Sequence, residues 1–293
     1  MMNLIDISSW QSGMNLSTMF SKNPDLDGVI VKVTQGLSYV NPPAKAWLDW
    51  LTKNGKPFGV YHYLDLYGAK EEAQHFVDVA KPYVDKGILV ADYEGNTVRK
   101  GAGYLKEFLD EVYRLTGVKA WVYCSQSIVA NNGFGAIAEA GHPLWMAQYA
   151  DYNPVKGFLE HPWQKGSVAP FSKYWLLQYT SCGYLDGWSD RLDLDLFYGD
   201  VSDWARLSGK EAPTPTPEPT PALKPATPEI VLRILHNDFG TGDERIAKIK
   251  AEGYDPVSCQ TTINRLYQVA GKLKTDIGND MPYLNCLLWI LRS

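Results

Sequence analysis

Two acidic residues, Asp92 and Glu94, directly follow the apolar run 88–91. If the extended backbone of a strand continues through them, residues two apart point to one face, about 6 to 7 Å apart at the backbone. Carboxyl groups that share a cleft resist joint ionisation, so one keeps its proton and can act as a general acid beside an anionic partner. Glycoside hydrolysis requires this division of labour. Alone, an Asp-x-Glu after a strand is also typical of an ordinary polar turn.

Two further acids lie at the edges of apolar segments. Asp6 falls within residues 4–10 (LIDISSW), and Asp193 within residues 191–197 (RLDLDLF). In the second segment, strand alternation places Asp193 and Asp195 on one face and three leucines on the other. That acidic face is either a solvated strand surface or the wall of a site, and periodicity does not separate the two interpretations.

The elements that would position these acids alternate along the first two thirds of the chain. Apolar runs rich in β-branched residues predict buried strands, and stretches with apolar residues three and four apart predict helices between them. Such alternation over about 200 residues implies a mostly parallel sheet covered by helices, and we expect an α/β fold closed into a modified, irregular TIM-like β/α barrel. The predicted strands are 28–33, 58–63, 87–91, 120–123, 144–147 and 174–178, and the predicted helices 43–54, 69–80 and 103–116.

The composition of the chain changes at residues 212–228 (APTPTPEPTPALKPATP), which are rich in proline and threonine. Repeated prolines fix φ and remove backbone donors, so this segment should be an extended polyproline II spacer. We therefore expect a catalytic barrel over residues 1–208, a linker over 209–228 and a small helical module over 229–269. Residues 270–293 form a tail to which no role is assigned.

Three short helices are expected in the second module, at residues 228–237, 243–251 and 255–269. Gly253 is a plausible stop for the second helix. Asp255 followed by Pro256 supplies an N-cap and a proline at the first helical position of the third. We therefore expect these helices to form a compact three-helix unit.

Composition excludes several kinds of partner. The formal net charge is only −5 and no long Lys/Arg cluster occurs, so neither a nucleic-acid backbone nor an anionic membrane surface is favoured, and a neutral polymer fits better. No run of about 18 apolar residues is present for membrane insertion. The N-terminus lacks a basic segment followed by an apolar stretch, so we expect no signal peptide. The four cysteines lack CxxC spacing, which argues against a zinc site and a dense disulfide framework.

The motifs occur in the order and spacing of the lysozymes of glycoside hydrolase family 25, which residues 3 to about 204 resemble. Any one of them is weak, but the ordered set is specific. They are residues 6–11 (DISSWQ), 31–36 (VKVTQG) with Tyr39, 59–63 (GVYHY), 92–94 (DYE), 122–125 (VYCS), 144–149 (LWMAQY), 177–180 (LQYT) and 193–197 (DLDLF).

The resemblance implies an N-acetylmuramidase that cleaves the β-1,4 bond between N-acetylmuramic acid and N-acetylglucosamine. It implies that Glu94 is the general acid and that Asp92 is its anionic partner, acting on the substrate's 2-acetamido group or on the oxocarbenium-like centre. Asp6 and Asp193 resemble the remaining acids of the cleft, which position substrate or tune Glu94. Carboxyl separations of about 5 to 5.5 Å and of about 6.5 to 9.5 Å are both compatible with this spacing, so retention and inversion stay open.

The sequence departs from the family pattern at two positions. Gln35 stands where members often carry Glu, and Asp195 where Asn is common. Neither removes a proposed catalytic acid. Asp195 is expected to add negative charge near the site and to shift the pH optimum.

Several polar and aromatic residues fall at strand ends in the matched motifs, where they would line a sugar groove, although each could instead be core packing. His62, flanked by tyrosines in a strand, is expected to be buried and hydrogen-bonded rather than a metal ligand. No metal and no cofactor are expected. The groove candidates are Trp10, Tyr61, Tyr63, Tyr93, Tyr123, Trp145, Gln148, Tyr149 and Gln178.

Residues 230–266 resemble the short cell-wall-binding repeats of certain phage lysozymes, on residues 238–245 (DFGTGDER) and 253–255 (GYD). The resemblance implies recognition of bacterial peptidoglycan. A single repeat should bind weakly unless the protein self-associates. The apolar end 286–291 would support a homo-oligomer or cover the core of the module. The residues that would touch ligand are Asp243, for which helix capping is an equal explanation, Arg245, Tyr254 and Gln260.

Two other functions remain open: a wall binder that holds glycan without cutting it, and a glycosidase for chitin or another N-acetylated glycan. By analogy with the family, the lack of a signal favours accumulation in the cytoplasm of a bacterial host, followed by holin-assisted release to the cell wall. The target bacterium, and whether the enzyme is of phage or bacterial origin, are not specified by the sequence.

Overall fold

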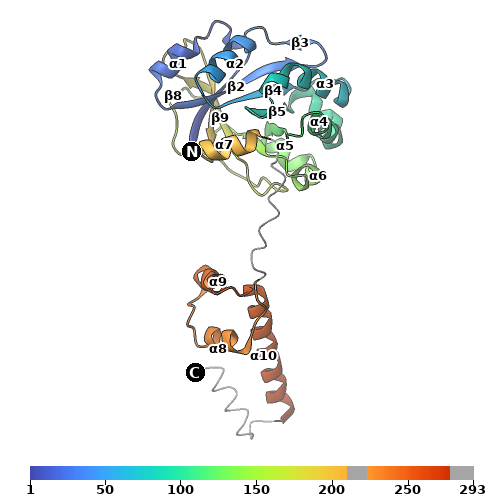
Figure 1. The fold of residues 1–293 in the computed structure, drawn as a ribbon, viewed down its shortest axis with the longest axis vertical. Coiled ribbons are helices and arrows are strands. Elements are labelled where there is room, and N and C mark those ends of the chain that lie inside the picture. The colour runs from blue at the N-terminus through green and yellow to red at the C-terminus, as the bar shows by residue number, and fades with distance from the viewer. Residues whose placement is uncertain (210–222, 278–293) are drawn as a thin grey trace. The chain divides into compact units, whose positions relative to one another are not determined.

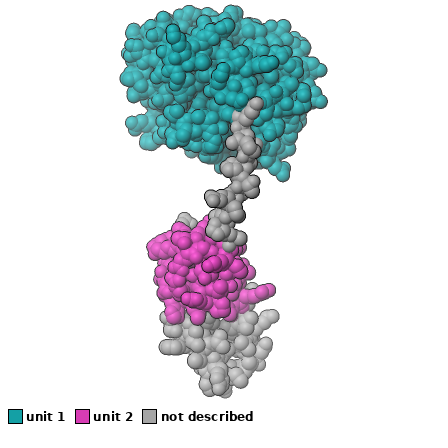
Figure 2. Space-filling model, in the orientation of Figure 1, with its two compact units in different colours: residues 1–212 teal, residues 213–293 magenta. Residues whose placement is uncertain are grey.

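The computed structural model describes residues 1–209 and 223–277. The chain divides into two compact units, residues 1–212 and residues 213–293 (Figure 2). Most of the proline-rich segment, for which an extended conformation is predicted, lies outside the described residues, as does the apolar end 286–291.

The first unit is a closed barrel of eight strands wrapped by helices (Figure 1). Each strand pairs with the next around the ring, and β1 closes it by pairing with both β2 and β10. The short strands β3 (Tyr39–Val40) and β8 (Val155–Lys156) pair alongside the last residues of β2 and β9, respectively. The eight barrel strands are β1 (Met2–Ile7), β2 (Leu26–Gln35), β4 (Phe58–Tyr63), β5 (Ile88–Asp92), β6 (Trp121–Ser125), β7 (Leu144–Ala147), β9 (Leu176–Tyr184) and β10 (Leu192–Phe197).

The predicted α/β barrel is confirmed, and its irregularity lies at β10. The strands from β1 through β9 pair in parallel around the ring, whereas β10 runs antiparallel to both of its neighbours, β9 and β1. Only residues 185–191 join β9 to β10. A connection this short can return the chain as a hairpin, but it cannot carry the crossover helix that a parallel partner needs.

Helices cover the outer face of the barrel by burying one apolar face each. In α4, Leu105, Phe108, Leu109 and Val112 recur three and four residues apart and are all fully buried. They pack into a core shared with the outward-facing side chains of the strands. The helices of this unit are α1 (Leu16–Lys22), α2 (Ala44–Lys53), α3 (Ala69–Ala80), α4 (Gly101–Thr116), α5 (Gln126–Asn131), α6 (Gly135–Glu139) and α7 (Val201–Ser208), with 3-10 turns at Ser9–Gln11, Lys81–Tyr83 and Gly95–Lys100.

Trp204 of α7 closes the amino end of the barrel. Its ring lies 6.1 Å from that of Trp121 and 5.1 Å from that of Phe197, and its Nε1–H donates to the carbonyl of Phe58 at 3.3 Å. Phe58 and Trp121 are the first residues of β4 and β6. Because this end is filled by aromatic packing, the open end of the barrel is the one at which the parallel strands finish.

The second unit consists, in its described part, of three helices: α8 (Pro228–Leu235), α9 (Gly242–Ala251) and α10 (Pro256–Ile277). As predicted, Gly253 follows α9 with a φ of +84°, and Asp255 caps α10 by accepting the backbone N–H groups of Val257 and Ser258. The third helix continues to Ile277, eight residues past its predicted end at 269. The helices share a small core of Ile230, Val231, Ile234, Phe239, Ile249, Cys259 and Ile263.

Membrane-spanning helices and disulfide bonds can be assessed for the described residues. Within 1–209 and 223–277, no helix is long and apolar enough to cross a membrane. The three cysteines in these ranges, Cys124, Cys182 and Cys259, are buried and free.

Candidate active site

A cleft of about 270 Å³ opens at the end of the barrel where the parallel strands finish and the antiparallel β10 begins. Each of the eight strands contributes at least one side chain to it, so residues far apart in the chain converge. The acids predicted to act together, Asp6, Asp92, Glu94 and Asp193, all line this cleft. Its other lining residues are Ser8, Trp10, Lys32, Tyr61, Tyr63, Tyr123, Trp145, Tyr149 and Gln178.

Asp92 and Glu94 lie on one face, as their spacing predicts. Asp92 is the last residue of β5, and the backbone N–H of Tyr93 continues the ladder by donating to the carbonyl of Tyr123 at 2.9 Å. Glu94 keeps an extended φ of −147° before the chain turns into the 3-10 segment. Tyr93 therefore points the other way, into the core between barrel and helices, where it is fully buried. The prediction that Tyr93 lines the groove is wrong because strand alternation turns it outward.

Gln178 of β9 organises one wall of the cleft. Its Nε2 donates to Asp6 Oδ2 at 2.6 Å, and its Oε1 accepts the hydroxyl of Tyr123 at 2.8 Å and that of Tyr149. Two hydroxyl donors on the carbonyl oxygen leave the amide nitrogen for Asp6, which fixes the orientation of the Gln178 amide. Gln178 and both tyrosines thus hold Asp6 in place.

The inner face of β10 is acidic and its outer face apolar, as alternation predicts. The three leucines of β10 belong to the core under the helices, so the acidic face points into the barrel. Asp193 pairs in register with Asp6 and lines the cleft, whereas Asp195 pairs with Leu4, deeper in the barrel. The choice left open by periodicity is thereby decided, because this face is the wall of the site.

Trp145 forms part of the floor rather than an exposed stacking surface. Its side chain is buried, its ring lies 4.6 Å from that of Tyr123, and its Nε1–H donates to Asp195 Oδ1 at 2.9 Å. Tyr61 is also buried, whereas Tyr63 is half-buried. Trp10 is 88% exposed on the rim, on the 3-10 turn that follows β1.

Burial of the acids raises their affinity for protons. Burial, with the charge of Glu94 second, raises the pKa of Asp92 well above its usual value, and it raises the pKa of Asp193 to about 6. Burial likewise raises the pKa of Glu94, and that of Asp6, to which Asp193 adds. Because these groups interact, protons bind to the cluster as a unit, and the cleft does not hold four free carboxylates at acidic pH.

Lys32 is a site residue that the sequence analysis did not single out. It extends from β2 into the cleft, with its Nζ 4.6 Å from the centre of the Tyr63 ring and 2.7 Å from Gln35 Oε1. Its positive charge lowers the pKa of both Asp92 and Glu94. Because Gln35 is neutral, it anchors Lys32 without compensating that charge. The feature of the sequence that could have identified Lys32 is a lysine within an otherwise apolar predicted strand.

Gln148 lies beside the acidic cleft and does not line it. Its side-chain amide bridges the backbone of Lys165, donating to the carbonyl and accepting the N–H, each at 2.8 Å. It lines an adjoining groove of about 410 Å³ that shares Glu94, Tyr123 and Tyr149 with the cleft. The structure therefore gives Gln148 a role in holding the loop after β7.

His62 lies outside the cleft, on the outer face of β4. Its Nδ1 is 2.8 Å from the hydroxyl of Thr34 and its Nε2 is 3.0 Å from Glu72 Oε2, all buried. This is the buried, hydrogen-bonded histidine predicted from the sequence. Among the described residues no cluster of three His, Cys, Asp or Glu side chains suits a metal ion.

A closed β/α barrel whose cleft gathers interacting carboxyl groups, flanked by tyrosine and tryptophan, is the kind of arrangement that glycoside hydrolysis requires. The model of glycosyl hydrolases family 25 matches residues 5–188, and the chain belongs to this family.

Relatives include an autolytic lysozyme of Clostridium acetobutylicum, 25% identical over 196 residues that make up 66% of this chain and 55% of that protein. The chain thus spans about half the length of this curated relative. A lysozyme of Streptococcus phage Cp-7 is 22% identical over 271 residues, 89% of this chain and 69% of the phage protein.

Solved structures show the same fold. The catalytic domain of an endolysin from bacteriophage P40 of Listeria monocytogenes superimposes with a TM-score of 0.57, at 26% identity over 71% of this chain and 98% of that domain. The bacterial lysozyme from Streptomyces coelicolor has a TM-score of 0.59, at 19% identity over 71% of this chain and 96% of its own.

Proposed function

We propose that this protein is a peptidoglycan hydrolase of the endolysin type, cleaving the β-1,4 bond between N-acetylmuramic acid and N-acetylglucosamine. The observation that carries the proposal is the convergence of Asp92 and Glu94 with Asp6 and Asp193 in one cleft of a family 25 barrel. Relatives with the names lysozyme and endolysin support this choice of substrate.

Glu94 is the general acid in this proposal. Burial raises its pKa, so it keeps a proton to pH values at which an ordinary glutamate has lost it. It gives this proton to the glycosidic oxygen as the bond from C1 to that oxygen breaks, and the bonding pair stays on the leaving oxygen. Its carboxylate then takes a proton from the water that attacks C1.

Asp92 orients the substrate's own acetamido group. Its Oδ1 is buried and has no hydrogen-bond donor among the residues that the structure describes, so an acetamido N–H would satisfy it. Accepting that N–H turns the acetamido oxygen toward C1, where it bonds as the leaving oxygen departs. Water then attacks C1 and releases the acetamido oxygen. Lys32 supports this role because its charge lowers the pKa of Asp92 and favours the anion that accepts the N–H.

Trp10 would bind a sugar ring at the mouth of the cleft. A tryptophan exposed over most of its surface beside an acidic cleft offers an apolar face on which a pyranose can stack. Tyr63, which is half-buried in the same cleft, would contribute a second ring. Together they would hold the glycan while the buried acids act on one bond.

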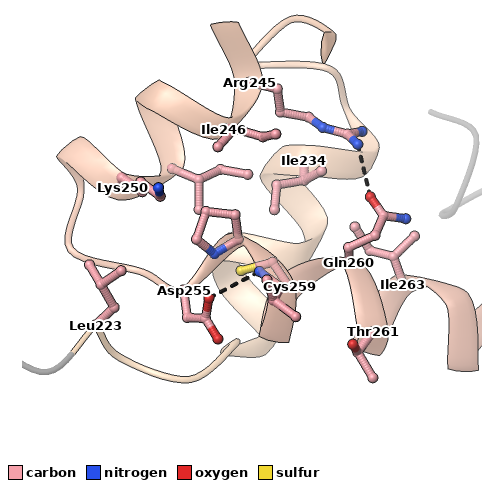
Figure 3. Close-up of a pocket in the computed structure, with 13 residues that line it drawn as sticks. Leu223, Ile234, Arg245, Ile246, Lys250, Asp255, Cys259, Gln260, Thr261 and Ile263 are labelled. Carbon is pink, nitrogen blue, oxygen red and sulfur yellow. Dashed lines mark hydrogen bonds between the residues drawn. The ribbon is translucent and has the colours of Figure 1, made fainter. Parts of the chain in front are cut away.

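We further propose that the second unit binds the cell wall. The alignment with the phage Cp-7 lysozyme spans 271 residues, more than the 212 of the first unit, so it extends into the second. A hollow of about 700 Å³ lies in this unit, and Arg245 and Gln260 stand together at it, joined by a 2.8 Å hydrogen bond (Figure 3). The apolar lining would contact the peptide of a muropeptide, and this polar pair would contact its amides or carboxylate.

The structure does not place the other two predicted ligand residues, Tyr254 and Asp243, at the hollow. Tyr254 packs half-buried against the module's core and does not line the hollow, and its ring faces Lys224. Asp243 lies in the first turn of α9, and its side chain is outside what the structure describes. Self-association through residues 286–291 likewise concerns residues outside the described ranges, and it stays a prediction, as does holin-assisted release from a host cytoplasm.

Mass spectrometry of the fragments released from purified peptidoglycan tests the proposal. The wild-type protein should release disaccharide-peptides with reducing muramic acid ends, and Glu94→Gln almost none. Glu107→Gln, a half-exposed position on α4, is the matched control and should behave as wild type. Binding without cleavage by the wild-type protein would favour the wall binder. Cleavage of chitin oligomers in preference to peptidoglycan would favour the other glycosidase.

A further inference from the structure

Asp195 is a buried carboxyl group that the mechanism above does not use. It lies on the inner face of β10, and none of its surface is exposed. Its Oδ1 accepts the indole N–H of Trp145, whereas its Oδ2 is buried without a hydrogen-bond partner among the described residues. A carboxylate with one neutral donor is unfavourable to bury, so this environment suits an uncharged acid.

Its neighbour is Asp6, whose carboxyl group accepts the side-chain N–H of Gln178, the residue directly opposite Asp195 in the register of β9 and β10. Two carboxylates contain no donor, so a bond between them requires a proton on one. Asp6 already accepts the N–H of Gln178 at 2.6 Å and lines the cleft, whereas Asp195 has the single indole donor. The anion is therefore better placed on Asp6 and the proton on Asp195.

The charges around the pair act in the same direction. Burial first, and then the charges of Asp6 and Asp193, raise the pKa of Asp195 well above its usual value. A hydrogen bond donated by Asp195 to Asp6 would act in the same direction, because it raises the pKa of Asp195 and lowers that of Asp6. The titratable groups that interact with Asp195 electrostatically are Asp6 from β1, Asp193 from β10 itself, Tyr149, and Tyr179 on the outer face of β9, whereas β7 presents the neutral Trp145.

We propose that Asp195 is a positioning residue that stays protonated at neutral pH and donates its hydroxyl hydrogen to Asp6, holding that carboxylate in the cleft. The pair then carries one negative charge instead of two. Asp195 adds no charge to the site, contrary to the expectation from sequence. An asparagine at this position would offer an amide N–H to the same acceptor, so Asp195→Asn should preserve both the hydrogen bond and the charge. The effect on catalysis rests on the proposed function, whereas the protonation does not.

Infrared difference spectroscopy of the full chain tests the protonation directly. The spectrum of wild type minus Asp195→Asn at neutral pH should contain the C=O stretch of a protonated carboxyl group. Wild type minus Asp110→Asn, an exposed carboxylate on α4, should contain carboxylate bands beside those of the new amide, and no such C=O stretch. A difference spectrum for Asp195→Asn that contains carboxylate bands and no protonated-carboxyl stretch overturns the proposal, whether or not the protein cleaves cell walls.

Urea unfolding against pH gives a second readout that needs no activity. A buried acid that keeps its proton binds one that an unfolded aspartate, with a pKa of about 3.9, has released. Wild type should therefore lose stability relative to Asp195→Asn as pH rises above about 4, up to the pKa of the folded pair. A stability difference that does not change with pH, or that changes in the opposite direction, contradicts the proposal.

The pH profile of kcat/KM on wall fragments tests the positioning role. Asp195→Asn should keep activity within about threefold of wild type with a superimposable profile, because donor and charge are both preserved. If Asp195 were ionised, removing its charge would lower the pKa of the neighbouring acids and move the profile to lower pH, which would overturn the proposal. Asp195→Leu, which lacks a donor, should lose about tenfold or more.

The infrared spectrum and the cleavage assay test the protonation of Asp195 and the proposed function separately. A protonated-carboxyl band without any wall cleavage would refute the proposed function and support the protonation of Asp195, whereas cleavage without the band would do the reverse. If Asp195→Leu fails to fold by circular dichroism, the comparison of wild type with Asp195→Asn still decides.

Discussion

Gln178 on β9 donates its side-chain N–H to Asp6 on β1 at 2.6 Å, joining two residues that are 172 positions apart in the chain. Two tyrosine hydroxyls hold the other end of the same amide. The position of an acid in the cleft therefore depends on a neutral side chain that takes no part in proton transfer.

Replacing Gln178 with Leu should lower kcat/KM on wall fragments by about 10- to 150-fold, because a hydrogen bond to a charged group contributes about 1.5 to 3 kcal/mol. Tyr123→Phe removes one of the two donors to the Gln178 carbonyl and should have a smaller effect. Steady-state kinetics on soluble fragments measures both. Equal losses in the two variants would contradict an orienting role for the Gln178 amide.

Lys32→Met should move the pH profile of kcat/KM to higher pH by about one unit. The Lys32 charge lowers the pKa of Asp92 and Glu94, so removing it raises both, and Glu94 then keeps its proton to higher pH. Lys56→Met, outside the cleft, is the control and should leave the profile in place. A shift of the Lys32→Met profile toward acid would show that its charge acts on other groups.

Trp10→Ala should weaken glycan binding and leave the fold intact. The exposed ring contributes little to the core, so the free energy of unfolding should change by less than about 0.5 kcal/mol. Loss of stacking, worth about 0.5 to 1.5 kcal/mol, should raise KM roughly 2- to 12-fold with a smaller change in kcat. A normal KM for a glycan long enough to reach the rim would remove Trp10 from the binding surface.

Trp204→Ala should destabilise the barrel by about 3 to 5 kcal/mol, because it empties the aromatic plug between Trp121 and Phe197. Chemical denaturation monitored by circular dichroism measures the loss. Val201→Ala, an exposed position on the same helix, is the control and should change stability little. A stability loss of only about 1 kcal/mol in Trp204→Ala would mean that α7 is dispensable as a closure.

Arg245→Leu should reduce the amount of protein that sediments with purified cell walls, without changing the rate at which soluble glycan fragments are cut. Arg245 lines the hollow of the second unit, whereas we expect the cleavage of soluble fragments to require only the first unit. Lys248→Leu, three residues later on α9, keeps the hollow intact and serves as the control. Equal wall binding by all three proteins would count against the hollow as the wall site.

Sequence alone determined the features that depend on local periodicity and on motif order. Short apolar runs predicted β4 and β7 to the residue, and the three- and four-residue spacing of apolar residues predicted α3 in the same way. The Asp-x-Glu spacing predicted that Asp92 and Glu94 share a face, since backbone alternation is a local property. The ordered motifs then indicated family 25, to which the chain belongs.

Tertiary structure decided what depends on partners distant in the chain. Alternation put Asp193 and Asp195 on one face of β10, but only closure of the barrel by β1 turned that face inward and made Asp195 a neighbour of Asp6. The same closure brought Lys32 to the acids and left Gln148 holding a loop. Burial and charge proximity determine protonation, and both arise from packing between strands far apart in sequence, so no local pattern of residues encodes them.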